Sequence, residues 1–225
     1  MSHAIRQCGW RALAVSCALL GACGDLIAQT APQPRTVEGN GPHSGATHPM
    51  TPRAVALVTA ARKQIGVTVS YDPAYTRLAY PGGDVPASRG VCTDVVIRAF
   101  RTQGMDLQRL VHEDMRAHFS KYPQKWSLRA PDRNIDHRRV PNLQTWFARE
   151  GWSIAVTDRA EDYRAGDLVT WMLPGNLPHI GIVSDRKTTL RGVPLILHNI
   201  GQGTREDDIL FDYKITGHYR PKPLR

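Results

Sequence analysis

The chain has 225 residues and a formal net charge of +9, from 29 basic and 20 acidic side chains. The basic residues are scattered, and no stripe alternates basic with aromatic residues, which argues against nucleic acid as a partner. A positive domain would suit anionic surfaces of a cell envelope, such as peptidoglycan carboxylates or lipid phosphates, or it would serve solubility alone.

The N-terminus has the pattern of an exported protein. A start with two arginines is followed by an apolar run from Ala12 to Ala22. This pattern predicts a secretory signal peptide over residues 1–22. The run is too short for the roughly 20 residues that span a bilayer.

The apolar run ends in Leu-Gly-Ala-Cys, which resembles a bacterial lipobox. The resemblance implies cleavage before Cys23 and acylation of its sulfur, and two or three acyl chains hold a protein on a membrane. Because Gly24 rather than aspartate follows, it also implies a periplasmic lipoprotein anchored to the outer membrane. Plain secretion, with cleavage near Ala28 or Ala31, is the alternative.

Counting cysteines isolates one thiol in the mature protein. Cys8 and Cys17 leave with the leader, and Cys23 is either acylated or removed. Cys92 then has no disulfide partner in an oxidising compartment, where exported proteins tend to use cysteines in pairs. It is either a buried small apolar residue or a reactive thiol.

Residues 23–50 are rich in Pro, Gly, Thr, Ser and Ala and contain few apolar residues. This composition cannot bury enough surface to fold, so we expect a flexible tether there. Residues 51–225 are long enough for one domain with a single core.

The domain is expected to begin with helices and to end with strands. Apolar periodicity, caps and glycines predict helices over residues 51–66, 92–103, 106–122 and 141–150, with a basic loop over 121–139. Patterns typical of strands follow at 152–156, 167–173, 179–185, 194–200 and 215–220. Helices followed by antiparallel strands predict an α+β domain in which the helices pack on a small sheet.

Cys92 lies at the start of the second expected helix. Unpaired amides and the positive end of the helix dipole stabilise an anion at that place. We therefore expect a lowered pKa for the thiol and a nucleophile near neutral pH. Gly90 allows a tight turn into the helix.

A nucleophilic cysteine needs a base, and the base needs an orienting partner. His179 begins one expected strand and His198 ends the next, so neighbouring antiparallel strands can bring them within hydrogen-bond reach. Asn199 faces the opposite side from His198, so only one of the two can orient His179.

Several segments resemble the NlpC-type cell-wall hydrolases, which are relatives of papain that cut peptidoglycan peptides. The matching segments are LVTAARKQIG, YPGGDVPASRGVC, RAGDLVTWM and HIGIV, in this order. More narrowly, VCTDVVIRAF, NIDHRRVPNL and LPHIGIVSD resemble a bacterial domain-of-unknown-function group within that superfamily. The resemblance implies a papain-like fold without a cofactor, and a Cys92, His179 and His198 triad; it favours His198 over Asn199.

The chain departs from that family around the cysteine. The family usually has Asp-Cys-Ser-Gly, whereas Val91, Thr93 and Asp94 surround Cys92 here. Asp94 is expected to pair with Arg98 or to stabilise the helix start. The family's oxyanion tyrosine has two candidates, Tyr71 and Tyr80, and the neighbouring Gly82-Gly83 favours Tyr80. The Cys92 amide would be the other oxyanion donor.

The segment 105–150 is longer than in common family members. Arg138 or Arg139 could bind a substrate carboxylate there, because the guanidinium fork matches a carboxylate. The alternative for this segment, and for the polar group His112, Glu113 and Asp114, is an ordinary solvated surface.

The resemblance therefore implies a cysteine hydrolase of peptidoglycan peptides, an endopeptidase or an amidase. A non-catalytic envelope-binding lipoprotein on the same fold is the main alternative. An acyltransferase would pass the same thioester to an amine. A zinc site made of Cys92, His179 and His198 is disfavoured, because the sequence lacks closely spaced ligand pairs.

Overall fold

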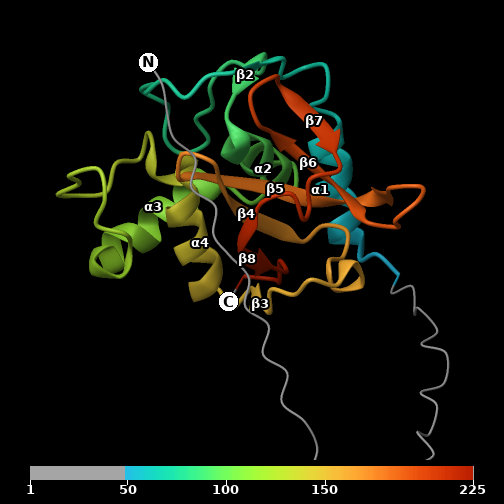
Figure 1. Cartoon of the computed structure of the whole chain (residues 1–225). Helices are drawn as coiled ribbons and strands as arrows, with labels where there is room; N and C mark the ends of the chain where they lie inside the picture. The colour runs from blue at the N-terminus through green and yellow to red at the C-terminus, as the bar shows by residue number, and fades with distance from the viewer. Residues whose placement is uncertain (1–48, 225) are drawn as a thin grey trace, which may run out of the picture. The chain divides into compact units, whose positions relative to one another are not determined.

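A computed structural model describes residues 49–224 of the chain (Figure 1). The expected signal peptide over residues 1–22, the lipidation residue Cys23 and the expected tether as far as residue 48 lie outside the described residues. No helix in the described part is both long enough and apolar enough to cross a membrane.

The described residues contain four α-helices, and sequence signals mark their ends. The Thr51 hydroxyl accepts the Ala54 amide at 3.2 Å before the first helix, and Asp106 caps the third in the same way. Gly104 and Gly151, which follow the second and fourth helices, have positive φ angles of 75° and 70°. The helices are α1 (Pro52–Arg62), α2 (Cys92–Arg101), α3 (Leu107–His118) and α4 (Val140–Arg149), with short 3-10 helices η1 (Phe119–Lys121), η2 (Asp136–Arg138) and η3 (Ala160–Asp162).

Six strands form one sheet in the order β3-β8-β4-β5-β6-β7, and every neighbouring pair is antiparallel. The domain is therefore α+β, as predicted. The strands are β3 (Ser153–Ile154), β4 (Leu168–Leu173), β5 (Leu177–Lys187), β6 (Pro194–Asn199), β7 (Thr204–Asp207) and β8 (Lys214–Tyr219). A separate parallel pair, β1 (Ser70–Tyr71) and β2 (Arg89–Gly90), precedes α2.

Two strand expectations need correction. The segment 152–156 forms only the two-residue β3 at the sheet edge, and β7 was not expected at all. Both are short edge strands, whose pairing depends on distant partners more than on their own apolar pattern.

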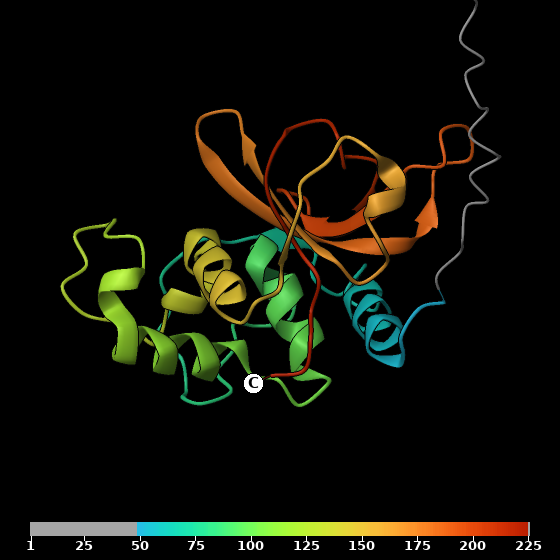
Figure 2. The ribbon, with the colours of Figure 1, turned by 90° about the horizontal axis from the view of Figure 1, so that it is seen from below.

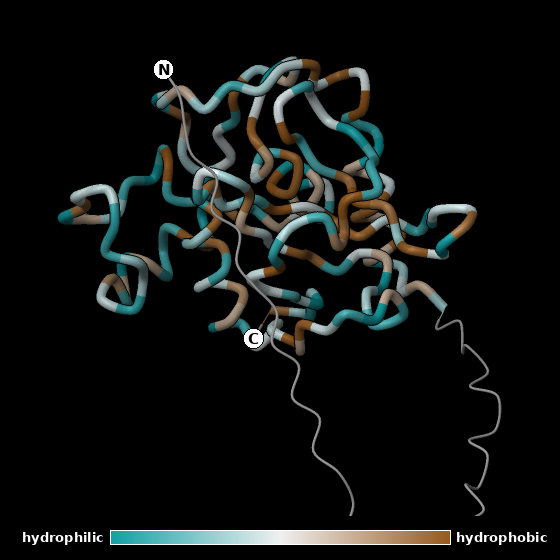
Figure 3. The backbone as a smooth tube through the Cα atoms, viewed as in Figure 1, coloured by the Kyte–Doolittle hydropathy of each residue, from teal (hydrophilic) through white to brown (hydrophobic). Residues whose placement is uncertain are grey.

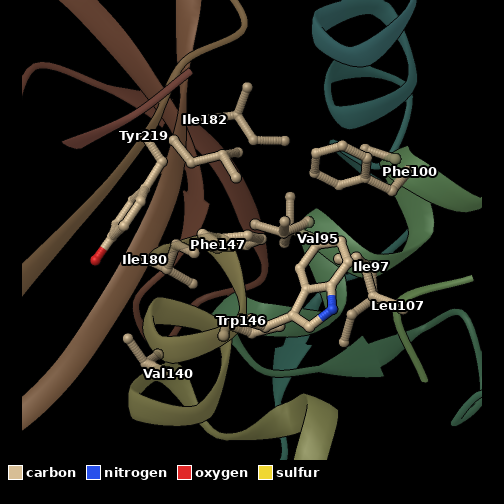
Figure 4. Packing of buried hydrophobic residues seen from close by; sticks show 14 of the residues in the cluster. Val95, Ile97, Phe100, Leu107, Val140, Trp146, Phe147, Ile180, Ile182 and Tyr219 are labelled. Atoms are coloured by element: carbon tan, nitrogen blue, oxygen red, sulfur yellow. The ribbon is translucent and has the colours of Figure 1, made fainter. Parts of the chain in front are cut away.

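The four α-helices lie on one face of the sheet, as Figure 2 shows. The main core fills the space between the two layers. In Figure 4, Ile180 and Ile182 of β5 point toward Val95 of α2 and Phe147 of α4. A smaller cluster on the other face contains Trp171 and other apolar residues of β4, β5 and β6.

Apolar residues gather in α2 and in the central strands, and hydrophilic residues occupy most of the outer loops (Figure 3). Eight of the ten residues of α2 are buried, including Cys92, Thr93 and Asp94 in its first turn. The helix start is thus enclosed by the rest of the fold, which matters for the chemistry of Cys92.

Candidate active site

Cys92 is the first residue of α2, and a carboxylate inside the first turn organises the helix start. The Val91 amide donates to Asp94 Oδ2 at 2.7 Å, which satisfies a donor that the helix leaves free. A Cβ on Gly90 would lie 2.9 Å from the same oxygen. Glycine is therefore needed before the cysteine because Asp94 approaches the backbone closely.

Asp94 also forms a buried ion pair with Arg138. Arg138 Nε and Nη2 donate to the two Asp94 carboxylate oxygens, each at 3.0 Å, and the two side chains are 2% and 4% exposed. The same guanidinium donates to the carbonyl oxygens of Asp72 and Ala74, each at 3.1 Å. These contacts connect the start of α2 to the segment before α4.

This pairing corrects two expectations. Arg98 does not pair with Asp94, because it donates to Asp84 at 2.8 and 3.1 Å. Arg138 is not available as a receptor for a substrate carboxylate, because its guanidinium is already occupied inside the protein. The second suggestion for Asp94, that it stabilises the helix start, agrees with the structure.

His179, His198 and Asp207 form a hydrogen-bonded chain across β5, β6 and β7. His179 Nε2 and His198 Nδ1 are 2.9 Å apart, and His198 Nε2 is 3.2 Å from Asp207 Oδ2. Both histidines are buried, with 2% and 0% of their surface exposed. Burial lowers the pKa of each imidazole, and each is therefore neutral near pH 7.

The chain fixes the tautomer of each ring. The Asp207 carboxylate only accepts, so His198 carries its single proton on Nε2 and donates it to Asp207. His198 Nδ1 is then an acceptor, so His179 donates to it from Nε2. The remaining nitrogen, His179 Nδ1, keeps its lone pair and makes no hydrogen bond within the described residues. It is the ring nitrogen that is free to accept a proton, and His179 is one of the residues that line the pocket.

Gly181 allows the two rings to meet. It lies two residues from His179 along β5, so it faces the same side of the sheet. A Cβ there would lie 3.2 Å from His198 Cβ and 2.4 Å from Ile196 Cγ2. The His-x-Gly spacing therefore leaves open the space that His198 occupies.

Burial, not the helix terminus, dominates the acidity of Cys92. The thiol is 4% exposed, and desolvation raises its pKa to about 12. The backbone amides of Ile180, Thr93 and Cys92 itself oppose this rise, whereas the charge of Asp94 adds to it. The expected lowering of the thiol pKa is therefore wrong, and in this state Cys92 is a neutral thiol.

Cys92 reaches the sheet next to His179. The thiol lies in the main core cluster together with Ile180, the residue after His179, and the backbone amide of Ile180 opposes the rise of the thiol pKa. No hydrogen bond joins the Cys92 sulfur to the His179 ring. Both residues line one pocket of about 440 Å³, so a ligand in that pocket can contact both.

The tyrosine beside the pocket is Tyr71, and the preference for Tyr80 is wrong. Tyr71 lines the pocket, and its pKa is raised to about 12, chiefly by burial and further by the charge of Asp94. Tyr80 instead packs edge-on against His112, with ring centroids 5.3 Å apart. The neighbouring amides of Gly82 and Gly83 bond residues of α3 and its cap, so these glycines belong to the helical layer.

Asn199 holds the segment before Cys92 in position. It is fully buried; its Nδ2 donates to the Gly90 carbonyl oxygen at 3.0 Å, and its Oδ1 accepts from the Gly201 amide at 3.1 Å. His198, rather than Asn199, contacts His179. Asn199 therefore connects the end of β6 to the residues that lead into α2.

Sequence reasoning missed Asp207 and the aromatic wall at Trp126. Asp207 follows the turn after β6, and the cross-strand pair His198–Arg205 places it diagonally next to His198. The Gly-Gln-Gly turn after β6 was the available signal for β7, because the segment TRED itself is entirely polar. Trp126 lines the pocket from an irregular segment, where no local pattern predicts its place.

The two histidine nitrogens that face each other are joined by a hydrogen bond, so they do not converge on a shared ligand position. Among residues 49–224, no group of three or more Cys, His, Asp or Glu side chains is arranged to hold a metal ion. The geometry is a hydrogen-bonded line from Asp207 through His198 to His179, and the last of these residues lines the pocket.

Comparison with known proteins places this site within one family. The chain is 57% identical over 166 residues to the protein described as "Uncharacterized protein YijF" of Escherichia coli (strain K12), which covers 74% of this chain and 80% of that protein. A family model described as "Domain of unknown function (DUF1287)" matches residues 58–221. That range includes Cys92, the two histidines and Asp207. The chain therefore belongs to the DUF1287 family.

Proposed function

We propose that this protein is a cysteine hydrolase of peptidoglycan peptides, an endopeptidase or amidase, on a papain-like fold of the NlpC type. The observation that carries the proposal is the chain from Asp207 through His198 to His179. It leaves an unprotonated nitrogen of His179 in the pocket that also contains Cys92.

The pKa values define how the nucleophile would be activated. The thiol has a raised pKa and the His179 imidazole a lowered one, so the resting pair is neutral. Cys92 would attack the amide carbonyl carbon while His179 Nδ1 takes the thiol proton. Formation of the imidazolium is supported by the hydrogen bond to His198 and, through it, by the charge of Asp207.

The remaining steps follow from this proton transfer. The amide of Cys92 would donate to the oxyanion, and the hydroxyl of Tyr71 is the second candidate donor. The imidazolium of His179 then protonates the leaving amine as the carbon–nitrogen bond breaks, which leaves a thioester on Cys92. Water, deprotonated by His179, attacks the thioester, releases a carboxylic acid and restores the thiol.

Sequence resemblance and the expected compartment support peptidoglycan as the substrate. The two most specific matching segments, GDLV and HIGIV, form the central strands β4 and β5, which pair from Leu168–Ile182 to Leu173–Leu177. The expected leader and Cys23 would place the protein in the periplasm, anchored to the outer membrane. There a domain with excess basic residues meets the carboxylates of the cell wall.

A binding protein without turnover is the second candidate. Complete burial of Cys92 and its raised pKa favour it, because a neutral thiol is a weak nucleophile. The two functions differ in whether the thiol ever leaves this neutral state.

The deciding experiment is incubation of the purified protein with muropeptides, followed by mass spectrometry of the products. Wild-type protein is expected to cleave a stem peptide with the addition of one water. Cys92→Ala is expected to lose cleavage while keeping the same thermal unfolding midpoint. Equal inactivity of both proteins, with retained binding, would instead support the binding function. A product that carries a new amine in place of water would identify an acyltransferase.

A further inference from the structure

The Cys92 pocket combines an apolar lining with an unbalanced positive charge. Of the described residues, no aspartate or glutamate lines it. Its charged lining groups are the guanidinium groups of Arg138 and Arg139, and most of the other lining residues are apolar, such as Ile135 and Leu177. The net charge that a ligand meets in this pocket therefore depends on whether each arginine has a carboxylate partner outside the pocket lining.

The two neighbouring arginines are paired very differently. The charge of Arg138 is neutralised by its bidentate pair with Asp94, and its guanidinium also donates to two backbone carbonyl oxygens. Arg139 has only a distant contact, with its Nη1 4.0 Å from Asp136 Oδ1. Both of these atoms are buried without a hydrogen-bond partner. The guanidinium group forms no hydrogen bond to another described residue, and the Arg139 side chain is 19% exposed and lines the pocket. Its donors other than the buried Nη1 are therefore open to an acceptor from a ligand.

Asp136 does not balance the charge of Arg139. Its side chain is fully buried, and burial raises the pKa of its carboxyl group to about 7. Near neutral pH a large fraction of the molecules therefore has a protonated, uncharged Asp136. The positive charge of Arg139 is then balanced only by the weaker influence of Asp132.

Trp126 fixes the orientation of the Arg139 fork. The guanidinium carbon of Arg139 lies 4.2 Å from the centre of the Trp126 ring. This cation–π contact uses the face of the guanidinium and leaves its edge free to donate. The indole is 47% exposed, so it offers apolar surface beside the charge.

We propose that Arg139, held against Trp126, is the carboxylate-binding subsite of this pocket. Its ligand is a chain that carries a carboxylate next to an apolar portion, and the two parts match Arg139 and the surrounding apolar wall. Under the proposed function, on which this assignment of the ligand rests, the carboxylate and the amide bond cut at Cys92 belong to one peptide. Arg139 then selects acidic stem peptides over amidated ones.

The test compares two probes on three variants. The probes are the stem tripeptide L-alanyl-γ-D-glutamyl-L-lysine and the same tripeptide with both carboxylates converted to amides. Binding is measured by calorimetry with the full chain carrying Cys92→Ala, so that no turnover intervenes. Arg139→Gln is added to this background, and Arg129→Gln, an exposed arginine on the same irregular segment, is the matched control.

The Cys92→Ala protein is expected to bind the free acid at least about tenfold more tightly than the amide, because a charge-assisted bidentate pair is lost with the amide. Arg139→Gln is expected to reduce this preference below about twofold, and Arg129→Gln to preserve it. A preference that survives Arg139→Gln, or no preference at all, would overturn the subsite. The wild-type protein could also bind the free acid more tightly than the amide and yet cleave neither the probes nor muropeptides. That result would support the subsite and refute the proposed hydrolase.

Discussion

One wall of the Cys92 pocket comes from the start of α2 and from β4 and β5, with β6 and β7 behind β5 in the sheet. Another comes from residues 126–141, which run from a loop through η2 into the first turn of α4. On the first wall, His179, His198 and Asp207 satisfy each other in a line. On the second, Arg139 Nη1 and Asp136 Oδ1 are buried and unpaired. The two walls thus differ in whether their polar groups are complete without a ligand.

This difference agrees with the two proposed roles, catalysis for the first wall and substrate recognition for the second. A base must have one defined tautomer before the substrate arrives, and rigid strands provide this preorganisation. A recognition group gains affinity when its partner comes from the ligand, because its unpaired state is then relieved only on binding. We expect substitutions on the first wall to change the rate, and substitutions on the second to change selectivity.

The largest expected effect is the loss of the base. His179→Gln removes the nitrogen that accepts the Cys92 proton, and general base catalysis contributes about 100- to 10,000-fold. We expect kcat on muropeptides to fall about 1,000-fold. His118→Gln, an exposed histidine at the end of α3, is the control and should leave kcat unchanged. Retention of more than a tenth of the activity by His179→Gln would exclude it as the base.

The second prediction contrasts the two arginines in stability. Arg138→Met leaves Asp94 as a buried carboxylate without its partner, and such losses cost about 3–5 kcal/mol. Arg139→Met removes a group with no hydrogen bond at Nη1, so its unfolding free energy should change by less than about 1 kcal/mol. Urea titrations measure both. Equal destabilisation would mean that Arg139 has a structural partner comparable to Asp94.

The third prediction concerns Asp207, which lies at the far end of the hydrogen-bonded line from His179. Asp207→Ala removes the acceptor that keeps the proton of His198 on Nε2, so His179 is no longer held in one tautomer. Loss of such supporting hydrogen bonds typically costs 10- to 100-fold, and we expect kcat to fall by about this factor. Nitrogen-detected NMR of the imidazoles should show mixed tautomers at His179.

Asp208→Ala is the matched control for Asp207→Ala, because the neighbouring Asp208 pairs with Arg191 instead of a histidine. It should leave both the tautomer and kcat unchanged. A single tautomer in Asp207→Ala, together with unchanged kcat, would show that Asp207 does not position the histidines.

Much of the fold was predictable because its signals are local. Thr51, Asp106, Gly104 and Gly151 mark helix ends in the chain itself, and each of the strands β4 to β6 is recognisable from a short apolar run of consecutive residues. The edge strand β7 was missed because its pairing is determined by β6 and not by its own sequence.

The site was predictable only where a motif carried it. Cys92, His179 and His198 come from short segments, whereas Tyr71, Asp207 and Trp126 reach the site through distant folding of the chain. The wrong prediction of an acidic thiol has the same origin. Helix-terminal amides are a local feature, but the desolvation that outweighs them depends on every element packed around Cys92.

The smallest expected effect is the pH dependence of stability that comes from two buried groups of the second wall, His137 and Asp136. Burial lowers the pKa of His137 to about 3, so the folded state stays unprotonated while the unfolded state gains a proton below about pH 6.5. This contribution removes stability as the pH falls from about 6.5 toward 3, by about 1.4 kcal/mol per pH unit.

The contribution of Asp136 to stability has the opposite pH dependence, because the pKa of its carboxyl group is raised to about 7. Its folded form keeps a proton that the unfolded form releases, so it adds stability as the pH falls from about 7 to 4.

Urea titrations between pH 7 and 4.5 can separate these two slopes. His137→Gln should make the protein gain stability, or lose less, as the pH falls, whereas Asp136→Asn should make the acid loss steeper than in wild type. If both variants shift the slope in the same direction, the two groups titrate as one hydrogen-bonded unit. Asp136 would then be tied to His137 and not left to face Arg139, and the positive charge of Arg139 would need another explanation.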